Sequence, residues 1–201
     1  MARAPRDKKI SRRPGRPVGT DNDTRSLIIQ TASALLAETG IEGLSNKLIC
    51  ERSAITPPTL YHHFPDKNAL LEALVTQAYV EFFKSKVKKS SSADPLVRYK
   101  EGWRNFANFA ATKPEHFKLI AGAAIAGRMP KIGYELYRYP VSDLEGIREK
   151  YGLKVGVALA AQLTVSTAFG ACMLPMAWPE IPWEAGLSET ALEAVLQFIL
   201  V

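Results

Sequence analysis

The chain has 201 residues, enough for one large or two small domains with a substantial core. Its 47% hydrophobic and 23% charged residues are typical of a soluble globular protein and exclude a disordered chain. Residues 1–20 hold seven Lys or Arg and one Asp, and the other 181 residues hold 19 basic and 19 acidic groups, so the net charge of +6 is concentrated at one end. A basic segment on a neutral body predicts a polyanionic partner, with nucleic acid favoured over an anionic membrane.

Residues 1–22 are rich in Arg, Pro and Gly and lack an apolar period, so we predict a disordered basic arm. The stretch 12–17 reads RRPGRP and resembles the Arg-Gly-Arg-Pro core of an AT-hook, with Pro14 in place of the first arginine. Arg13 and Arg16 are therefore candidates for contacts in a narrow A·T-rich minor groove. The alternative is a solvated arm that binds phosphates without sequence preference. No apolar segment follows the charges, so a secretory signal is not expected.

From Asp23 onward, apolar residues recur with the 3.6-residue helical period. We expect a first helix that ends at Gly40, and then three more: one from Ser45 to about 53, one from about 57 to 64, and one from about 66 towards 87. The turn between the second and third helices has three or four residues, which is the spacing of a helix-turn-helix motif. Residues 23–80 are predicted to form one small domain, with the motif at about 45–64.

The third helix has the features of a recognition helix. Thr56 is a candidate N-cap, and Pro57 and Pro58 follow where missing backbone N–H groups cost least. Leu60 and Phe64 are expected in the core, and the other side carries hydroxyl, phenol and imidazole groups. A short, stiff helix of this kind suits a DNA major groove. The alternative is a short surface helix of any all-α protein.

Residues 81–201 are predicted to form a larger helical domain behind a polar loop at 84–94. We expect further helices over 96–112, from Pro114 to about 121, over 132–151 with a bend at Pro140, over 153–174, and over 188–199 with Ser188 as the cap. No strand-like alternation is found, so the fold class is all-α. Cys50 and Cys172 lie in apolar helical surroundings and are expected to be buried free thiols.

The helix predicted over 153–174 is apolar and rich in Ala, Gly and Ser, which allows a neighbouring helix to approach closely. The stretch 155–178 is also a candidate membrane span by length. Polar residues interrupt it, among them Gln162, Thr164 and Ser166, so a core or dimer helix is favoured.

Residues 59–70 read TLYHHFPDKNAL, behind a helix that ends in Gly40 and a second helix that begins with Ser45. This order resembles the TetR family of transcriptional regulators, whose pattern is T-L-Y-x-H-F-x-x-K-x-x-L. The resemblance covers residues 24–75, and its recognition helix is similar to that of the tetracycline-repressor branch. Cys50 stands where the family usually has Ala, and Ala54 stands where it usually has the turn Gly. Beyond residue 80 only the layout is similar, so the family's ligands do not transfer.

The resemblance implies DNA contacts from the first three helices and from the start of the fourth. Thr24 and Arg25 would hold a backbone phosphate, Lys47 would read guanine, and the prolines would leave part of the readout apolar. Tyr61 and His63 would bond phosphates. The candidate DNA-binding set comprises Thr24, Arg25, Asn46, Lys47, Thr56, Pro57, Pro58, Thr59, Tyr61, His62, His63 and Lys67, with Arg13 and Arg16 from the arm.

The second domain is expected to hold an apolar or aromatic effector. Its candidate pocket residues are Trp103, Phe106, Phe109, Phe117, Tyr134, Tyr137, Phe169, Met173 and Trp178, with plain core as the alternative. His116 lacks a supporting polar cluster, so a tetracycline sensor is not expected. His62 and His63 lie about 100° apart on a helix and cannot chelate one metal as an i, i+4 pair would. We predict no catalytic residues, no metal and no cofactor.

These features predict a cytoplasmic, effector-released repressor that binds a pseudo-palindromic operator as a homodimer. The helices at 153–174 and 188–199 would pair across the two-fold axis as a four-helix bundle, and Leu196→Glu is expected to give monomers. Three alternatives remain: an architectural AT-hook-like DNA-binding protein without an effector, a helical enzyme, and a membrane-associated protein.

Overall fold

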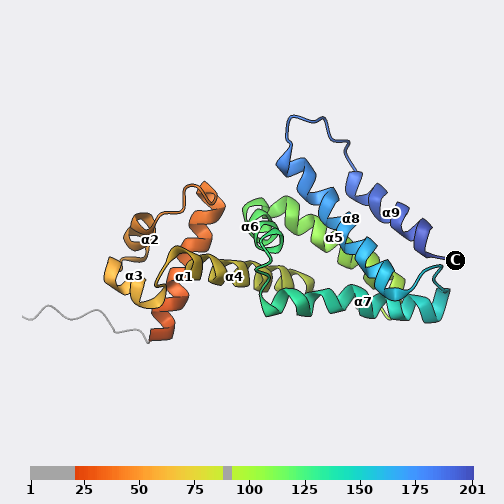
Figure 1. Ribbon diagram of the computed structural model, residues 1–201, viewed down its shortest axis with the longest axis horizontal. Helices are drawn as coiled ribbons and strands as arrows, with labels where there is room; N and C mark the ends of the chain where they lie inside the picture. The colour runs from red at the N-terminus through yellow and green to blue at the C-terminus, as the bar shows by residue number, and fades with distance from the viewer. Residues whose placement is uncertain (1–20, 88–91) are drawn as a thin grey trace, which may run out of the picture.

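The computed structural model describes residues 21–87 and 92–201. Arg13, Arg16 and the rest of the arm up to residue 20 lie outside the described residues, as do residues 88–91 of the predicted polar loop. Within the described ranges the regular secondary structure is helical, apart from one isolated antiparallel bridge between Leu153 and Leu200 (Figure 1). The prediction of an all-α fold is confirmed.

Four helices form the N-terminal part: α1 (Asp21–Thr39), α2 (Asn46–Ser53), α3 (Pro57–His63) and α4 (Lys67–Val87). Local signals set their ends. Gly40 closes α1 with a φ of +67° and donates its N–H to the carbonyl of Leu36 at 2.9 Å. The Ser45 hydroxyl accepts from the backbone N–H of Leu48 at 3.3 Å, and Asp66 Oδ1 accepts from that of Ala69 at 2.8 Å. α1 begins two residues before the expected Asp23, so the end of the predicted arm is helical.

The body contains α5 (Pro95–Thr112), α6 (Pro114–Ile125), α7 (Lys131–Tyr151), α8 (Val157–Ala177) and α9 (Leu187–Ile199). α4 runs out of the N-terminal helices into the body, where α5, α6 and α7 pack against it (Figure 1). α8 and α9 pack against each other at the far edge of the body. The long α4 therefore connects the predicted DNA-binding helices with everything that follows.

Several predicted boundaries were wrong. α4 continues to Val87, so the predicted loop at 84–94 begins later, and α6 continues through Gly122 because the residues around it are buried. α8 begins at Val157 instead of 153, because Lys154 lies in a bend and donates its N–H to the carbonyl of Ile199 at 2.8 Å instead of entering the helix. Pro175 lies inside α8 instead of ending it.

The predicted cap of α9 was also wrong. The N-cap is Gly186, whose φ is +87°, and Ser188 lies inside the first turn. The carbonyl and the hydroxyl of Ser188 both accept from Trp103 Nε1, each at 3.0 Å. Because its carbonyl and hydroxyl both face the indole of Trp103, Ser188 ties α9 to α5 instead of starting the helix.

Two hydrophobic clusters stabilise the fold. The first joins α1–α4 to α5, α6 and α8 and includes Leu36, Leu60, Phe82, Phe117 and Cys172. The second lies among α5, α7, α8 and α9. The first cluster crosses residue 80, so the predicted domain boundary at 80–81 falls inside one helix and within one continuous core. The N-terminal helices are consequently packed onto the body.

The prediction of two buried free thiols is confirmed. Cys50 and Cys172 are 7% and 8% exposed and are not paired. Burial raises the pKa of the Cys172 thiol to about 11, which keeps it protonated and unreactive at neutral pH.

Candidate nucleic-acid interface

The buried side of α3 fixes the helix to the N-terminal core. Leu60 is 1% exposed and Phe64 is 3% exposed, which confirms both as core residues. Tyr61 lies on the other side with 51% of its surface exposed. The helix thus has one anchored apolar side and one side that is free for a partner.

The start of α3 differs from the prediction. Thr56 has the extended backbone of an N-cap (φ −91°, ψ 155°), but its side chain makes no capping bond to a backbone N–H. Its hydroxyl lies 2.9 Å from the hydroxyl of Thr59 instead. Pro57 and Pro58 remove two of the N–H groups that a cap could have satisfied. The helix therefore begins with two exposed proline rings beside a pair of bonded hydroxyls.

The turn between α2 and α3 is closed by a left-handed residue. Ala54 has φ 53° and ψ 43°, and it is the one non-glycine residue with positive φ among residues 21–87 and 92–201. Its N–H bonds back to the last turn of α2, and the N–H of Ile55 donates to the carbonyl of Cys50 at 3.1 Å. The turn that the family closes with Gly is therefore made here by Ala, at a cost of about 1–2 kcal/mol for this conformation.

The first turn of α2 lies next to α3. Asn46 Nδ2 donates to the Tyr61 hydroxyl at 3.2 Å, which joins the two helices at their exposed edge. The Lys47 side chain is 84% exposed, and its Nζ is 3.9 Å from Glu51 Oε1, a distance too long for a strong ion pair. Lys47 is therefore free to extend towards a partner.

The two histidines of α3 have different environments. The His62 side chain is 71% exposed, whereas that of His63 is 5% exposed. Both Nε2 atoms lie 3.6 Å from Asp21 Oδ1 at the start of α1. The expectation that His63 is free to bond a phosphate is thus not supported, because its ring is packed beneath Asp21. Asp21 itself was assigned to the disordered arm, and no local motif distinguishes it.

The remaining candidates lie around the same surface. The Arg25 guanidinium stacks 5.0 Å from the centre of the Phe64 ring, and Thr24 beside it is half-buried. Lys67 is exposed at the first position of α4. Apart from the two arm arginines outside the described residues and the buried ring of His63, the predicted DNA-binding residues are brought to one end of the N-terminal helices.

The predicted effector residues separate into three groups. Phe106, Phe109, Phe117 and Phe169 belong to one aromatic cluster, in which ring centres of Phe106 and Phe117 are 5.4 Å apart and those of Phe117 and Phe169 are 5.6 Å apart. Phe82 of α4 completes this cluster at 5.2 Å from Phe109, and Met173 packs against the same core. The sequence-based set missed Phe82, although the doublet Phe82-Phe83 in a helix was a usable signal.

The other two groups do not join this cluster. Trp103 is 4% exposed and belongs to the second core, where its indole donates to Ser188. Tyr134, Tyr137 and Trp178 are 62%, 39% and 48% exposed. These four residues lie outside the phenylalanine cluster of the protomer, because Trp103 packs in the second core and the period of α7 and the end of α8 turn the other three outward.

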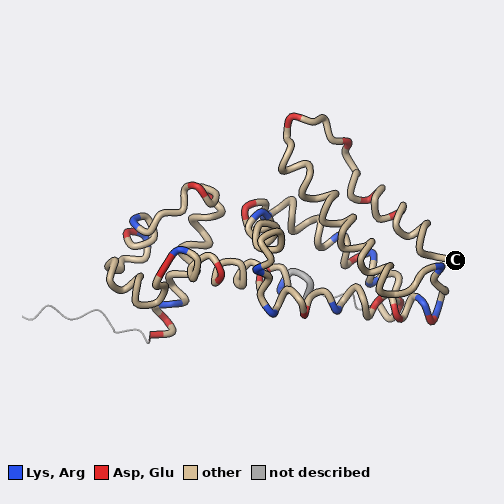
Figure 2. The backbone as a smooth tube through the Cα atoms, viewed as in Figure 1, with Lys and Arg blue, Asp and Glu red and all other residues tan. Residues whose placement is uncertain are grey.

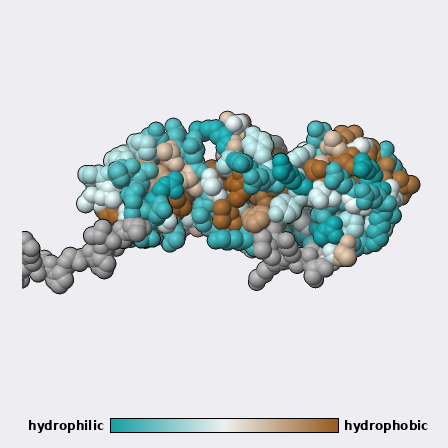
Figure 3. All heavy atoms as spheres, turned by 90° about the horizontal axis from the view of Figure 1, so that it is seen from below, coloured by the Kyte–Doolittle hydropathy of each residue, from teal (hydrophilic) through white to brown (hydrophobic). Residues whose placement is uncertain are grey.

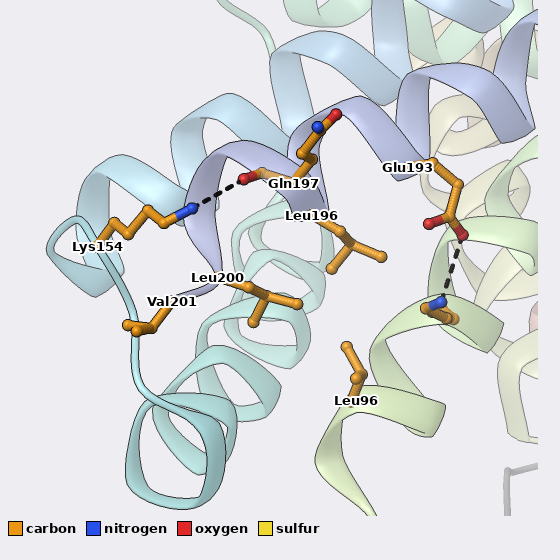
Figure 4. Close-up of a pocket in the computed structure, with 8 residues that line it drawn as sticks. Leu96, Lys154, Glu193, Leu196, Gln197, Leu200 and Val201 are labelled. Atoms are coloured by element: carbon orange, nitrogen blue, oxygen red, sulfur yellow. Dashed lines mark hydrogen bonds and ion pairs between the residues drawn. The ribbon is translucent and has the colours of Figure 1, made fainter.

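A cavity of about 510 Å³ lies elsewhere, between the start of α5 and the end of α9 (Figure 4). Leu96, Leu196 and Leu200 form its apolar lining. Lys100 pairs with Glu193 at 3.3 Å, and Lys154 donates to the Gln197 carbonyl at 3.2 Å. The polar groups at its rim are thus already engaged with each other, and none of the predicted effector residues lines it.

Over the described ranges, no group of three or more His, Cys, Asp or Glu residues is arranged to hold a metal ion. α8 is long and apolar enough to cross a membrane by length and composition, with 21 residues and a mean hydropathy of 1.7. Buried helices of soluble proteins meet the same criteria, so this is weak evidence for a membrane span.

The arrangement of α2 and α3 and the exposed polar side of α3 are typical of a DNA-binding helix-turn-helix domain. Residues 28–74 match the model of the bacterial regulatory proteins of the TetR family. The chain is 44% identical over 54 residues to the HTH-type transcriptional regulator UidR of Escherichia coli K12, which is 27% of this chain and 28% of that protein. It is 46% identical over 50 residues to the class C tetracycline repressor protein of Escherichia coli, which is 25% of this chain and 23% of the repressor. The chain thus matches less than a third of the length of these curated relatives.

The likeness in structure extends over almost the whole chain. A TetR-family transcriptional regulator from Agrobacterium tumefaciens has the same fold with a TM-score of 0.64 and 19% identity, over 90% of this chain and all of that one. RolR in complex with resorcinol matches with a TM-score of 0.67 and 21% identity, over 89% and 88% of the two chains. Residues 28–74 thus carry the N-terminal segment typical of the TetR family, and the rest of the chain shares with these solved structures the fold alone.

Proposed function

We propose that the protein is a repressor that binds a pseudo-palindromic operator as a homodimer and is released by a small apolar or aromatic effector. The observation that carries this proposal is the division of α3 into a buried side, held by Leu60 and Phe64, and an exposed side of polar groups. A recognition helix needs both, because phosphate and base contacts require a rigid support.

The chemistry of this surface favours combined phosphate and base contacts. The Lys47 side chain is 84% exposed, and a lysine can donate to O6 and N7 of guanine. Tyr61, Lys67 and Arg25 supply donors and charge for phosphates around it. The exposed rings of Pro57 and Pro58 present apolar surface at the tip of the helix, which suits the methyl groups of thymine.

The proposed dimer interface lies on α8 and α9. α8 is uncharged along its length (Figure 2), yet only 28% of its apolar window is buried within the protomer. At 100° per residue, Leu159, Ser166 and Gly170 lie on the side opposite its buried residues. Phe198 of α9 is 57% exposed. An apolar face of this kind favours a second copy of the chain as its cover.

The proposed effector site is the aromatic cluster of Phe82, Phe106, Phe109, Phe117 and Phe169. It draws on α4, α5, α6 and α8, so a ligand that separates these rings would act on the end of α4 that carries Phe82. RolR, which has this fold, is known in complex with resorcinol. A small aromatic molecule is therefore the effector class that we propose. It would act by binding better to the conformation that does not fit the operator.

The experiment is selection of DNA from a random pool with the full chain, followed by footprinting of the selected sites. We expect two inverted half-sites whose centres are separated by one turn of the DNA helix, about 34–36 Å, or by a larger whole number of turns. Tight binding that shows no preference among sequences, with a steep salt dependence, would instead support the architectural alternative. A panel of small aromatic compounds is then tested for release of the selected operator.

Removal of residues 1–20 separates the contribution of the arm from that of α3. We expect the truncated chain to select the same half-sites with a flatter salt dependence, because up to seven cations are lost. An unaltered slope would show that the arm does not contact DNA. We place the protein in the cytoplasm, where its proposed DNA partner is accessible.

A further inference from the structure

The Asn46 side chain, one of the predicted DNA contacts, is already engaged with Tyr61. Its Nδ2 donates to the phenol oxygen at 3.2 Å, across 15 residues of chain and between two helices. Asn46 is the first residue of α2, fixed by the Ser45 cap, and half of Tyr61 is exposed. The bond therefore lies on the surface proposed to meet DNA and not in the core.

This contact determines where the phenol proton can point. A tyrosine hydroxyl donates one hydrogen bond and can accept others. Because Asn46 is the donor, the oxygen of Tyr61 accepts and its own proton is left for another acceptor. Tyr61 is 51% exposed and its bond to Asn46 lies at the surface, so an acceptor from a partner can reach the hydroxyl. A phosphate oxygen is a charged acceptor, and bonds to such groups are roughly twice as strong as bonds between neutral groups.

We infer that Asn46 is a positioning residue for Tyr61: its amide orients the phenol so that the phenol proton is presented to a phosphate of the DNA backbone. This inference rests on the proposed DNA-binding function and deepens it. A hydroxyl that is oriented before binding loses less conformational freedom when the complex forms. Asn46 then contributes to affinity through Tyr61 and not by reading a base.

The opposite arrangement has opposite consequences. If Oδ1 of Asn46 accepted the phenol proton, Tyr61 would have no proton for a phosphate. Removal of the Asn46 amide would then free the hydroxyl and increase DNA affinity. The sign of the effect of Asn46→Ala therefore distinguishes a donor from an acceptor.

The test uses the full chain and the operator obtained by selection. We expect Tyr61→Phe to weaken binding about tenfold or more, as for loss of a hydrogen bond to a charged group. Asn46→Ala is expected to weaken it about three- to tenfold, and the double variant should bind no more weakly than Tyr61→Phe alone. Asn108→Ala, the same truncation at an exposed position of α5, is the matched control and should bind like the wild type.

A second readout separates positioning from helix packing. Each phosphate of one half-site is replaced in turn by a neutral methylphosphonate. We expect one position at which the replacement weakens the wild type, has no effect on Tyr61→Phe, and has a reduced effect on Asn46→Ala. A merely structural role would weaken binding evenly at all positions and would lower the melting temperature.

The outcomes are distinguishable. Higher affinity of Asn46→Ala, additive effects in the double variant, or a methylphosphonate profile unchanged by Asn46→Ala would each refute the positioning role while leaving the DNA-binding function in place. A wild-type chain that enriches no DNA sequence would refute the proposed function itself, and the inference with it.

Discussion

α3 and α8 each leave one side uncovered in the protomer, and the two sides have opposite chemistry. The exposed side of α3 carries phenol, imidazole and hydroxyl groups over a buried anchor of Leu60 and Phe64. The exposed side of α8 carries Leu159, Val165 and small residues without a charge. Figure 3, which views the molecule from below, shows hydrophobic patches on the body and a mostly hydrophilic surface over the N-terminal helices.

The difference teaches what kind of partner each region can accept. A polar, hydrogen-bonding face keeps its water until a charged, hydrated partner such as DNA replaces it. An apolar face gains about 25 cal/mol for each Å² removed from water, and a second apolar face is the partner that provides this gain. The family model covers the helices around α3, at residues 28–74, whereas the likeness of the body to a solved structure is one of fold at 19% identity.

The largest expected effect comes from charge on the apolar face. Leu159→Glu or Phe198→Glu should weaken dimerisation more than 100-fold, because each places two unpaired carboxylates in the interface. Light scattering gives the mass, and operator binding should be lost with the dimer. Leu196→Glu is not a suitable test, contrary to the sequence-based expectation: Leu196 is 3% exposed inside the protomer, so this change would unfold it.

A matched pair of glycines gives a control for this prediction. A Cβ atom added at Gly170 in α8 or at Gly122 in α6 would meet nothing within 4 Å in the protomer. Gly170→Leu should therefore separate the subunits, whereas Gly122→Leu should leave the dimer intact. Dimers of both variants would place the interface away from this side of α8.

The next largest effect comes from the anchor of α3. Leu60→Ala should lower the free energy of unfolding by about 2–5 kcal/mol, because it removes a side chain that is 1% exposed. Denaturant unfolding measures the loss. Tyr61→Phe on the exposed side is the control and should change stability by less than about 0.5 kcal/mol. Equal effects would show that α3 does not have one anchored and one free side.

A smaller effect concerns the contact between α1 of the N-terminal helices and α6 of the body. His116 Nε2 of α6 lies 2.8 Å from Ser33 Oγ of α1 in a buried contact. Burial lowers the pKa of His116, opposed by the nearby carboxylates of Glu81 and Glu115 and aided by Lys113. The unfolded chain therefore takes up the proton first, so the stability from neutral His116 is full above pH 6.5 and is lost as the pH falls below it.

This pH dependence can be measured against a variant without the imidazole. Between pH 7.5 and 5.5 the wild type should lose more unfolding free energy than His116→Gln, by at most about 1.4 kcal/mol per pH unit. Denaturant unfolding at several pH values gives both slopes. Equal pH dependences of the unfolding free energy in the two chains would contradict a role for the burial of His116 in the contact between α1 and α6.

The smallest effect sharpens the picture of the turn before α3. Ala54→Gly should stabilise the chain by about 0.5–1 kcal/mol, because Gly adopts the left-handed conformation without a Cβ penalty. The higher conformational entropy of Gly in the unfolded chain offsets only part of this gain. Ala37→Gly in the exposed helical surface of α1 is the control and should destabilise by about 0.5–1 kcal/mol. Destabilisation by both changes would show that the turn at Ala54 carries no strain.

Sequence reasoning was most successful where local signals decide the structure. Gly40 and Ser45 correctly mark the end of the first helix and the start of the second, and Leu60 and Phe64 are buried as predicted. It was least successful where distant segments decide. Ser188 was expected to cap a helix from its residue type, but the indole of Trp103, 85 residues away, holds it inside the first turn of α9. The exposure of Tyr134 and Tyr137 depends on which side of α7 faces α4, which spacing alone does not specify.

The sequence by itself determined the helical class, the helix-turn-helix motif and the polar character of α3, because caps, turn residues and the 3.6-residue period act over a few positions. Only the tertiary structure decided which groups of that helix are free. It packed His63 beneath Asp21, joined Asn46 to Tyr61, and left the uncharged side of α8 uncovered. These outcomes depend on contacts between segments far apart in the chain, whose geometry is set by how the helices pack and not by the residues next to them.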